Sequence, residues 1–325
     1  MKAVVFRAPG GPEVLEIADV PEPVPGPNEV LVDVRATALN RADLLQRRGR
    51  YPAPPGTSDI LGLECSGVVA ALGEGAARFG LGARVMALLP GGGYAARVVV
   101  HQDVLMAVPE RLSFEQAAAV PEAFLTASEA LLVEAELLAG QRLLVTAAAS
   151  GIGCAAVQIG KQRGAFVIGS ASTEKLAALS ALGADLVLDR DRPDYVEALR
   201  AGTQERGVDA IVDLVGGSAL ARHQACLAPR GRLVLVGLLG GAAAPLDLSS
   251  ILMKRQRICG LLMRSRNVAE RIELVRRFER ELWPALDTGV LSPCIDQIFP
   301  LADVALAHAR MERNLNVGKI VLALS

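Results

Sequence analysis

Residues 143–172 read LLVTAAASGIGCAAVQIGKQRGAFVIGSAS, and this stretch decides the fold. An apolar run at 143–147 is followed by a turn of small residues, a helical segment and a second apolar run at 166–169. A strand, turn, helix and strand in this order form a βαβ unit, the context that a dinucleotide-binding motif requires. The stretch therefore predicts one half of a doubly wound parallel sheet that binds a nucleotide.

The turn inside this stretch departs from the usual G-x-G-x-x-G pattern. Gly151 and Gly153 are present, but Ala148 and Ser150 stand where the first two glycines would be. Small side chains still let the backbone approach a pyrophosphate, and the free N–H groups at the start of the helix point toward it. We expect the phosphates to bind at this turn. A tight packing turn without a ligand is the alternative.

The end of the second strand indicates which nicotinamide cofactor is used. Sites that select NAD place an acidic residue there, about 20 residues after the glycines. This chain has Ser170, Ser172 and Lys175 instead, and Glu174 is expected on the next helix. Hydroxyl groups and an ammonium would accept a 2′-phosphate, which favours NADPH. Ordinary N-capping by Ser172 or Thr173, with Lys175 solvated, is the competing interpretation.

The remaining sequence shows two patterns of predicted secondary structure. Short β-like runs alternate with glycine turns over 61–100, and three earlier strands are expected at 2–7, 13–20 and 29–36. Such a pattern is typical of a small, irregular barrel. Beyond about residue 115, helical stretches alternate with short apolar runs, which specifies a parallel sheet covered on both faces. A long helix at 268–283 precedes a return to strands.

Composition and charge argue against several classes of protein. Half of the residues (51%) are apolar and 21% are charged, which is a globular composition. A formal net charge of −1, with both signs interleaved, gives no attraction for nucleic acid. No apolar stretch approaches the roughly 20 residues that span a bilayer, and no signal peptide is apparent. The odd number of widely spaced cysteines predicts reduced thiols in a cytoplasmic protein.

Residues for metal or acid-base catalysis are scarce. Only His101, His223 and His308 occur, none of them spaced with a partner ligand, so no catalytic zinc is expected. Neither a G-x-S-x-G elbow, a Y-x-x-x-K pair nor a Walker loop is present. We interpret the histidines as surface or packing residues.

Seven segments, taken in order, resemble the zinc-free quinone oxidoreductases of the medium-chain dehydrogenase/reductase superfamily, in particular the tumour-suppressor-inducible group of animals. The segments are ALNRADLLQRRGRYPAPPGTSDILGLECSG (38–67), LLPGGGYA (88–95), AAVPEAFLTA (118–127), AAASGIG (147–153), GLLGG (237–241), LLMRSR (261–266) and NLNVGKIVL (314–322). The likeness covers essentially the whole chain.

The resemblance implies an α/β protein with a GroES-like catalytic domain at 1–122 and 267–325 and a Rossmann domain at 123–266. Zinc enzymes of the superfamily have Cys where Asn40 stands and His where Leu63 stands, so both ligands are missing. The relatives pair as homodimers through their nucleotide domains. We expect the same here, through the apolar region 246–262, which we interpret as β-rich.

Site residues are also implied by position. The phosphates would lie on 150–153, the adenosine end near Ser170, Ser172 and Lys175, and the nicotinamide half near Asn40. Arg190 stands where relatives often have a Tyr that contacts the 2′-phosphate; it could make that contact or pair with Asp191. The full set of implied cofactor-binding residues is Asn40, Thr126, Ser150, Gly151, Ile152, Gly153, Ser170, Ser172, Lys175, Arg190, Leu238, Leu262, Met263, Arg264 and Asn316.

The chemistry expected is hydride transfer from NADPH to a small quinone, which needs placement more than acid-base groups. Tyr51 and Asn40 are the candidate catalytic residues, with protons from water or Tyr51, although Tyr51 could equally be an interface residue. Glu64 could orient active-site groups or make a structural hydrogen bond. Reduction of the C=C bond of an enal, enone or enoyl thioester is the alternative activity. A non-enzymatic nucleotide-sensing or RNA-binding protein is a third possibility.

Overall fold

The computed structural model describes residues 1–324 and divides into two compact units. The terminal unit comprises residues 1–125 and the residues from 263 onward. The middle unit comprises residues 126–262. Each is described by itself below.

The middle unit is built on a six-stranded sheet in which every neighbouring pair of strands is parallel. Its strands are β8 (Arg142–Val145), β9 (Phe166–Ala171), β10 (Leu186–Asp189), β11 (Val208–Asp213), β12 (Leu227–Leu235) and β13 (Arg257–Gly260). Leu144, Ile168 and Ile211 from the central strands are fully buried in one apolar cluster. Strands buried on both faces explain why the sequence shows continuous apolar runs here instead of alternation.

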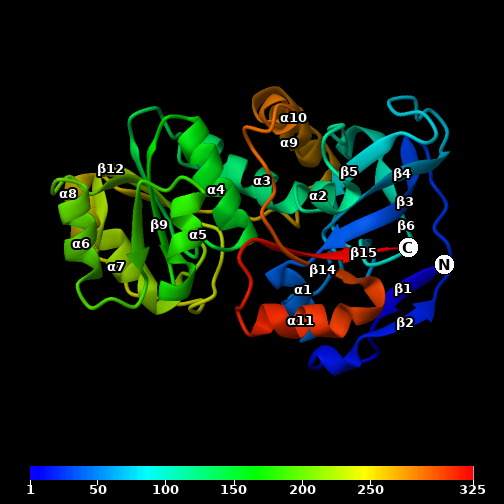
Figure 1. The fold of residues 1–325 in the computed structure, drawn as a ribbon, viewed down its shortest axis with the longest axis horizontal. Coiled ribbons are helices and arrows are strands. Elements are labelled where there is room, and N and C mark those ends of the chain that lie inside the picture. Colours follow the sequence, from blue (N-terminus) through cyan, green and yellow to red (C-terminus); the bar gives the residue numbers. More distant parts are fainter. Residues whose placement is uncertain (325) are drawn as a thin grey trace. The chain divides into compact units, whose positions relative to one another are not determined.

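The helices of the middle unit cover both faces of this sheet. Figure 1 shows α4 and α5 on one side of β9, and α6 and α7 on the other. The elements are η3 (Glu129–Glu134), α4 (Gly151–Gln162), η4 (Thr173–Lys175), α5 (Leu176–Ala181), α6 (Tyr195–Gly202), η5 (Gly217–Ala219), α7 (Leu220–Ala225) and α8 (Leu248–Lys254), and α3 (Pro121–Ser128) leads into the unit.

Strand order confirms the predicted doubly wound fold. The order is β10-β9-β8-β11-β12-β13, so the chain moves outward from β8 in one direction and then returns to continue from β11 in the other. Right-handed crossovers place the helices of the two halves on opposite faces. Ligands of such sheets bind beyond the carboxyl ends of the strands, where the direction reverses. In this unit that point lies between β8 and β11.

The terminal unit is rich in β structure, as predicted. Its main sheet has seven strands in the order β14-β15-β3-β4-β5-β7, with β6 also paired to β3, and β1 and β2 form a separate pair. The strands are β1 (Lys2–Val5), β2 (Glu16–Asp19), β3 (Glu29–Ala38), β4 (Glu64–Leu72), β5 (Arg84–Leu88), β6 (Arg97–His101), β7 (Leu105–Ala107), β14 (Ile295–Pro300) and β15 (Lys319–Ala323). Strands from both ends of the chain therefore share one sheet.

Close approach of β3 and β4 depends on a glycine. A Cβ atom added at Gly67 would lie 2.0 Å from the backbone oxygen of Asp33. The helices of this unit are η1 (Pro12–Val14), α1 (Arg41–Arg47), η2 (Gln102–Val104), α2 (Phe114–Ala118), α9 (Val268–Glu281), α10 (Trp283–Asp287), η6 (Leu301–Asp303) and α11 (Val304–Glu312). No helix among residues 1–324 is both long and apolar enough to cross a bilayer.

One expectation from the sequence is wrong in the structure. Region 246–262 is not β-rich throughout, because α8 occupies Leu248–Lys254 and only β13 is a strand. Asp247 begins this helix by accepting a hydrogen bond from the backbone N–H of Ser250 at 3.0 Å. Two of the three histidines, His223 and His308, are buried and hydrogen-bonded to polar side chains, which is compatible with the expected packing role.

Candidate functional site

The turn after β8 has the geometry of a phosphate-binding turn. Ser150 begins α4, and its hydroxyl accepts a hydrogen bond from the backbone N–H of Gly153 at 3.1 Å. A Cβ atom at Gly153 would lie 2.5 Å from the oxygen of Ala148, so only glycine lets the helix start this close to the turn. Ala147 has a positive φ of 43°. The tight turn leaves the N-terminal end of a twelve-residue helix at the carboxyl edge of the sheet.

The end of β9 lies beside this turn. The backbone N–H of Ala148 donates to the oxygen of Ser170 at 2.9 Å, which joins the turn to the second strand. Ser170, Ser172 and Lys175 are all buried, so the structure does not support a solvated Lys175. Ser172 precedes η4, but its side chain makes no capping hydrogen bond to the backbone there.

Glu174 lies closer to this position than the sequence indicates. It belongs to η4, and its carboxylate accepts a hydrogen bond from the hydroxyl of Ser172 at 2.5 Å. That hydrogen bond is the largest influence that lowers the pKa of Glu174. An acidic group therefore does reach the end of the second strand, although it comes from the following turn.

Arg190 makes the second of its two anticipated contacts. Its Nε lies 3.1 Å from Oδ2 of Asp191, and both side chains are largely exposed. The guanidinium is thus paired with its neighbour in the chain. The carboxylate of Asp191 would compete with a 2′-phosphate for this guanidinium.

A buried pair that the sequence analysis missed lies at the end of β11. Nδ1 of His223 lies 2.9 Å from Oδ2 of Asp213, and both residues are buried. Oδ1 of Asp213 accepts hydrogen bonds from the Thr146 hydroxyl and from the N–H groups of Val215 and Gly216. The signal was available, since Asp213 ends an apolar strand and is followed by two glycines, Gly216 and Gly217.

In the terminal unit, Asn40 lies at the end of β3 and immediately before α1. Its Nδ2 donates to Oε1 of Glu64 at 2.9 Å and to the oxygen of Ala38 at 3.3 Å. Its Oδ1 accepts from Nζ of Lys319 at 2.7 Å. Both N–H donors of the amide are therefore in use, and its oxygen faces the ammonium of Lys319. Glu64 makes an ion pair with Lys319, which the sequence analysis did not single out.

Tyr51 lies on the proline-rich loop that follows α1, and Arg264 holds this loop in place. The Arg264 guanidinium lies 5.1 Å from the centre of the Tyr51 ring and donates to the backbone oxygen of Tyr51 at 3.3 Å. It also donates to the oxygen of Pro90 and to Oε1 of Gln46. Partial burial raises the pKa of the Tyr51 hydroxyl, with Arg264 acting in the opposite direction. Tyr51 therefore stays protonated at neutral pH and can donate a hydrogen bond.

The remaining residues implied by position differ in exposure. Leu238 and Leu262 are 51% and 55% exposed, while Ile152 is intermediate. Thr126, Met263 and Asn316 are buried, and Nδ2 of Asn316 donates to the oxygen of Gly318 at 2.8 Å. Exposed Leu238 and Leu262 are available to contact a ligand, whereas Asn316 supports its own loop.

No group of three or more His, Cys, Asp or Glu side chains among residues 1–324 is arranged to hold a metal ion. Leu63, at one of the two positions where zinc enzymes have a ligand, is buried in the apolar core. Asn40, at the other, is engaged with Glu64 and Lys319.

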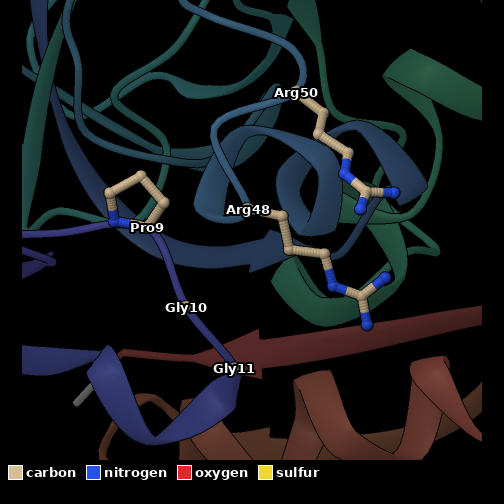
Figure 2. Close-up of a pocket in the computed structure, with 5 residues that line it drawn as sticks. All are labelled: Pro9, Gly10, Gly11, Arg48 and Arg50. Carbon is tan, nitrogen blue, oxygen red and sulfur yellow. The ribbon is translucent and has the colours of Figure 1, made fainter.

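A surface pocket of about 280 Å³ lies elsewhere in the terminal unit, and Figure 2 shows the residues that line it: Pro9, Gly10, Gly11, Arg48 and Arg50. None of these residues is implied in the site. Arg48 is paired with Glu312 at 2.7 Å, and the N–H groups of Gly10 and Gly11 are already hydrogen-bonded. The pocket therefore offers few free groups to a ligand.

Comparison with known proteins identifies the class. Residues 26–110 match the model of the alcohol dehydrogenase GroES-like domain, and residues 151–279 match that of the zinc-binding dehydrogenases. A quinone oxidoreductase of Pseudomonas aeruginosa is 35% identical, with 99% of each chain covered. The human synaptic vesicle membrane protein VAT-1 homolog is 31% identical, covering 99% of this chain and 86% of that protein. The chain belongs to the medium-chain dehydrogenase/reductase superfamily and is an oxidoreductase.

Solved structures agree on the fold and differ in activity. An NAD-dependent alcohol dehydrogenase is 35% identical with a TM-score of 0.89, and 100% of each chain is covered. A quinone oxidoreductase of Pseudomonas syringae is 32% identical with a TM-score of 0.88, and 99% of each chain is covered. The CurK enoyl reductase is 27% identical with a TM-score of 0.88, covering 100% of this chain and 99% of that one. Together these relatives indicate a nicotinamide cofactor and a small-molecule substrate.

Proposed function

We propose that this oxidoreductase reduces small quinones with NADPH and without zinc. The observation that carries the proposal is the pair of residues at the positions of the zinc ligands: Leu63 is apolar, and the amide of Asn40 is bound to Glu64 and Lys319. Neither side chain offers a metal the thiolate or imidazole it prefers. A substrate that reacts here has to be electrophilic by itself, as a quinone is.

The turn at 147–153 fits a nicotinamide dinucleotide, because Gly153 lets the backbone close up and the N-terminus of α4 faces the carboxyl edge of the sheet. When bound, the cofactor supplies a hydride. Buried Lys175 and the hydroxyls of Ser170 and Ser172 support a site for a 2′-phosphate. Glu174, which accepts from Ser172, is the group in this site that would favour NADH instead.

Tyr51 is the proposed proton donor. A quinone that accepts a hydride needs one further proton to become a hydroquinone, and an oxygen gains negative charge as the hydride arrives. The raised pKa of Tyr51 keeps its hydroxyl protonated and able to donate that proton to the oxygen, and water then returns a proton to Tyr51. Asn40, with both N–H groups engaged, shapes the site and can only accept from a ligand.

Reduction of an activated C=C bond is the second candidate activity. The likeness to the CurK enoyl reductase favours it, because that enzyme has the same fold over the whole chain. Hydride transfer to the β carbon of an enone or enoyl thioester needs the same placement over the nicotinamide and a proton at the α carbon. Because the chain belongs to a family of oxidoreductases, a purely nucleotide-sensing or RNA-binding role is not favoured.

We also propose that the protein is a cytoplasmic homodimer. All five cysteines are free thiols, as suits a reducing compartment. The helix α8, which precedes the edge strand β13, exposes Leu248, Leu252 and Met253, which are 72%, 76% and 78% exposed. Apolar side chains beside an open sheet edge are suited to pairing with a second copy.

The decisive experiment compares three electrophiles under identical conditions. Oxidation of NADPH is followed at 340 nm with a small quinone, a 2-alkenal and an enoyl-CoA, and each is repeated with NADH. We expect kcat/KM to be highest for the quinone with NADPH. A higher value for the enoyl-CoA or alkenal would establish the second activity instead, and a preference for NADH would contradict the cofactor assignment.

A further inference from the structure

The ammonium group of Lys319 is buried in the terminal unit, at the first residue of β15. It donates to the backbone oxygen of Leu39 at 2.8 Å and to Oδ1 of Asn40 at 2.7 Å, and it pairs with Oε1 of Glu64 at 2.6 Å. An ammonium has three N–H groups, so every donor is in use. Lys319 is therefore not available as a ligand for substrate, and its role lies in what it holds.

Glu64 faces this ammonium from the first position of β4 and is fully buried. Its Oε1 is shared by Lys319 and Nδ2 of Asn40, and its Oε2 accepts from the backbone N–H of Glu122 at 2.8 Å. The carboxylate thus joins the end of β3, the start of β4 and the start of α3. The charges of Lys319 and Glu64 compensate each other inside the unit.

Together the charges of Lys319 and Glu64 allow the amide of Asn40 only one orientation. Its oxygen faces the ammonium of Lys319, and its nitrogen faces the carboxylate of Glu64. Rotating the amide by half a turn would place NH₂ against NH₃⁺ and oxygen against the carboxylate, which loses both hydrogen bonds and adds two repulsive contacts. Neutral neighbours would impose no such preference.

We propose that Lys319 is a positioning residue that acts through Asn40, fixing the side of the amide that is presented to the nicotinamide half of the cofactor. This inference rests on the proposed function, in which Asn40 flanks that half. The competing role for Lys319 is only to neutralise Glu64. The two roles differ in what happens when both charges are removed together.

The test uses the full-length protein and four variants. They are Glu64→Gln, the double variant Glu64→Gln/Lys319→Met, and Asn40→Ala in the wild-type and in the double-variant background. Glu64→Gln is the matched reference, because it lacks the carboxylate but keeps the Lys319 bond to Asn40. Replacing both residues removes a buried pair without leaving a lone charge, so the double variant is expected to fold. Thermal unfolding checks that point, and the comparison is made between variants of similar midpoint.

We expect kcat with NADPH and a small quinone to be about ten- to a hundredfold lower in the double variant than in Glu64→Gln, because a misplaced group costs about this much. Asn40→Ala should lower kcat in the wild type and have little further effect in the double variant, since its function is already lost there. If the double variant equals Glu64→Gln, or if Asn40→Ala costs the same in both backgrounds, Lys319 only neutralises Glu64 and the proposal is overturned.

A second readout separates this inference from the proposed function. The Kd and emission maximum of bound NADPH, measured by fluorescence, report the surroundings of the nicotinamide without turnover. We expect the double variant and Asn40→Ala to change both quantities in the same way relative to Glu64→Gln. If the wild type reduces none of the electrophiles, the proposed function fails while these binding data still decide the positioning role. If the emission of bound NADPH were unchanged in the double variant and in Asn40→Ala, the positioning role of Lys319 would be overturned.

Discussion

The carboxylate of Asp213 and the imidazole of His223 form a buried hydrogen-bonded pair, with 2.9 Å between Oδ2 and Nδ1. The second oxygen of Asp213 accepts from the Thr146 hydroxyl at 3.0 Å and from the N–H groups of Val215 and Gly216 at 2.8 and 3.1 Å. Burial acts to raise the pKa of Asp213, but His223 and the two N–H donors outweigh it and lower that pKa below its usual value. One carboxylate thus fixes the loop that follows β11.

Replacing Asp213 with Asn should destabilise the protein. The amide has one acceptor oxygen in place of two and no charge, so at least one charge-assisted hydrogen bond is lost, at a cost of about 1.5 to 3 kcal/mol. Asp191→Asn is the control, because its pair with Arg190 is exposed and contributes about 0 to 1 kcal/mol. Urea unfolding measures both free energies. Equal effects of the two substitutions would show that the Asp213 pair does not hold the loop.

Asp43 in the terminal unit has an unusual pKa for a different reason. Complete burial raises the pKa of its carboxyl to about 6, although the N–H groups of Asn40 and Gly62 and the charge of Lys319 act against that rise. The folded protein therefore holds this proton more tightly than the unfolded chain, where the pKa is about 3.8. The stability that Asp43 contributes is fully present below about pH 4 and is lost as the pH rises through about 6.

The Asp43→Asn variant should reveal this dependence. Two units of pKa correspond to roughly 3 kcal/mol, so ionisation of Asp43 should cost the wild type up to about this much between pH 4 and 7. Asparagine does not titrate. The variant should be less stable than the wild type at pH 4.5, and the difference should shrink by pH 7. Unfolding free energies at four pH values measure it, and a difference that stays constant or grows would contradict the assigned pKa.

Local patterns in the sequence were sufficient to predict the nucleotide-binding half. The apolar runs become β8 and β9, and Ser150 begins α4 as its position before the small-residue turn indicates. The helix α8 was missed because its apolar residues suggested a strand, although Asp247 offered an N-cap three residues before Ser250. A capping signal outweighs apolar content when the segment lies on the surface.

The polar cluster of the terminal unit could not be predicted in this way. Asn40 lies 24 residues from Glu64 and 279 residues from Lys319, so no local spacing joins them. Only the pairing of β15 with β3 and of β3 with β4 brings their side chains together. The contact between Arg264 and Tyr51 spans 213 residues and is equally invisible to periodicity.

Metal chelators should leave the activity unchanged. Asn40 and Leu63 replace the zinc ligands of related enzymes, so NADPH oxidation after dialysis against EDTA should remain within about twofold of the untreated protein. Elemental analysis of the same sample provides the control. Stoichiometric zinc in the purified protein, with activity lost on its removal and restored on its return, would overturn the metal-free mechanism.

Dimerisation should depend on α8. Introducing Leu252→Glu and Met253→Glu places two charges among its exposed apolar side chains, and desolvating them would oppose pairing. Val24→Glu is the control, because Val24 is 84% exposed in the terminal unit. Sedimentation at micromolar concentration should show a dimer for the wild type and Val24→Glu and a monomer for the double variant. A monomeric wild type would contradict the proposal.

Choice of cofactor should depend on Lys175. This residue is buried at the end of β9, near the positions where Ser170 and Ser172 are expected to meet the adenosine ribose. Only NADPH brings a phosphate there, and a charge-assisted contact to it contributes roughly 1.5 to 3 kcal/mol. Lys175→Ala should therefore raise the Kd for NADPH by about ten- to a hundredfold and change the Kd for NADH little.

Arg190→Ala is the matched control for Lys175→Ala, because it removes the same charge from an exposed pair with Asp191. Because Asp191 already compensates the charge of the exposed Arg190, whereas Lys175 is buried, removing Arg190 should raise the Kd for NADPH less than Lys175→Ala does. Glu174→Gln removes the carboxylate that accepts from Ser172 and should weaken the binding of NADH more than that of NADPH. Fluorescence titration of both cofactors into all three variants measures these effects. If Lys175→Ala weakened the binding of NADH and NADPH equally, or if the wild type bound NADH more tightly, Lys175 would not recognise the 2′-phosphate.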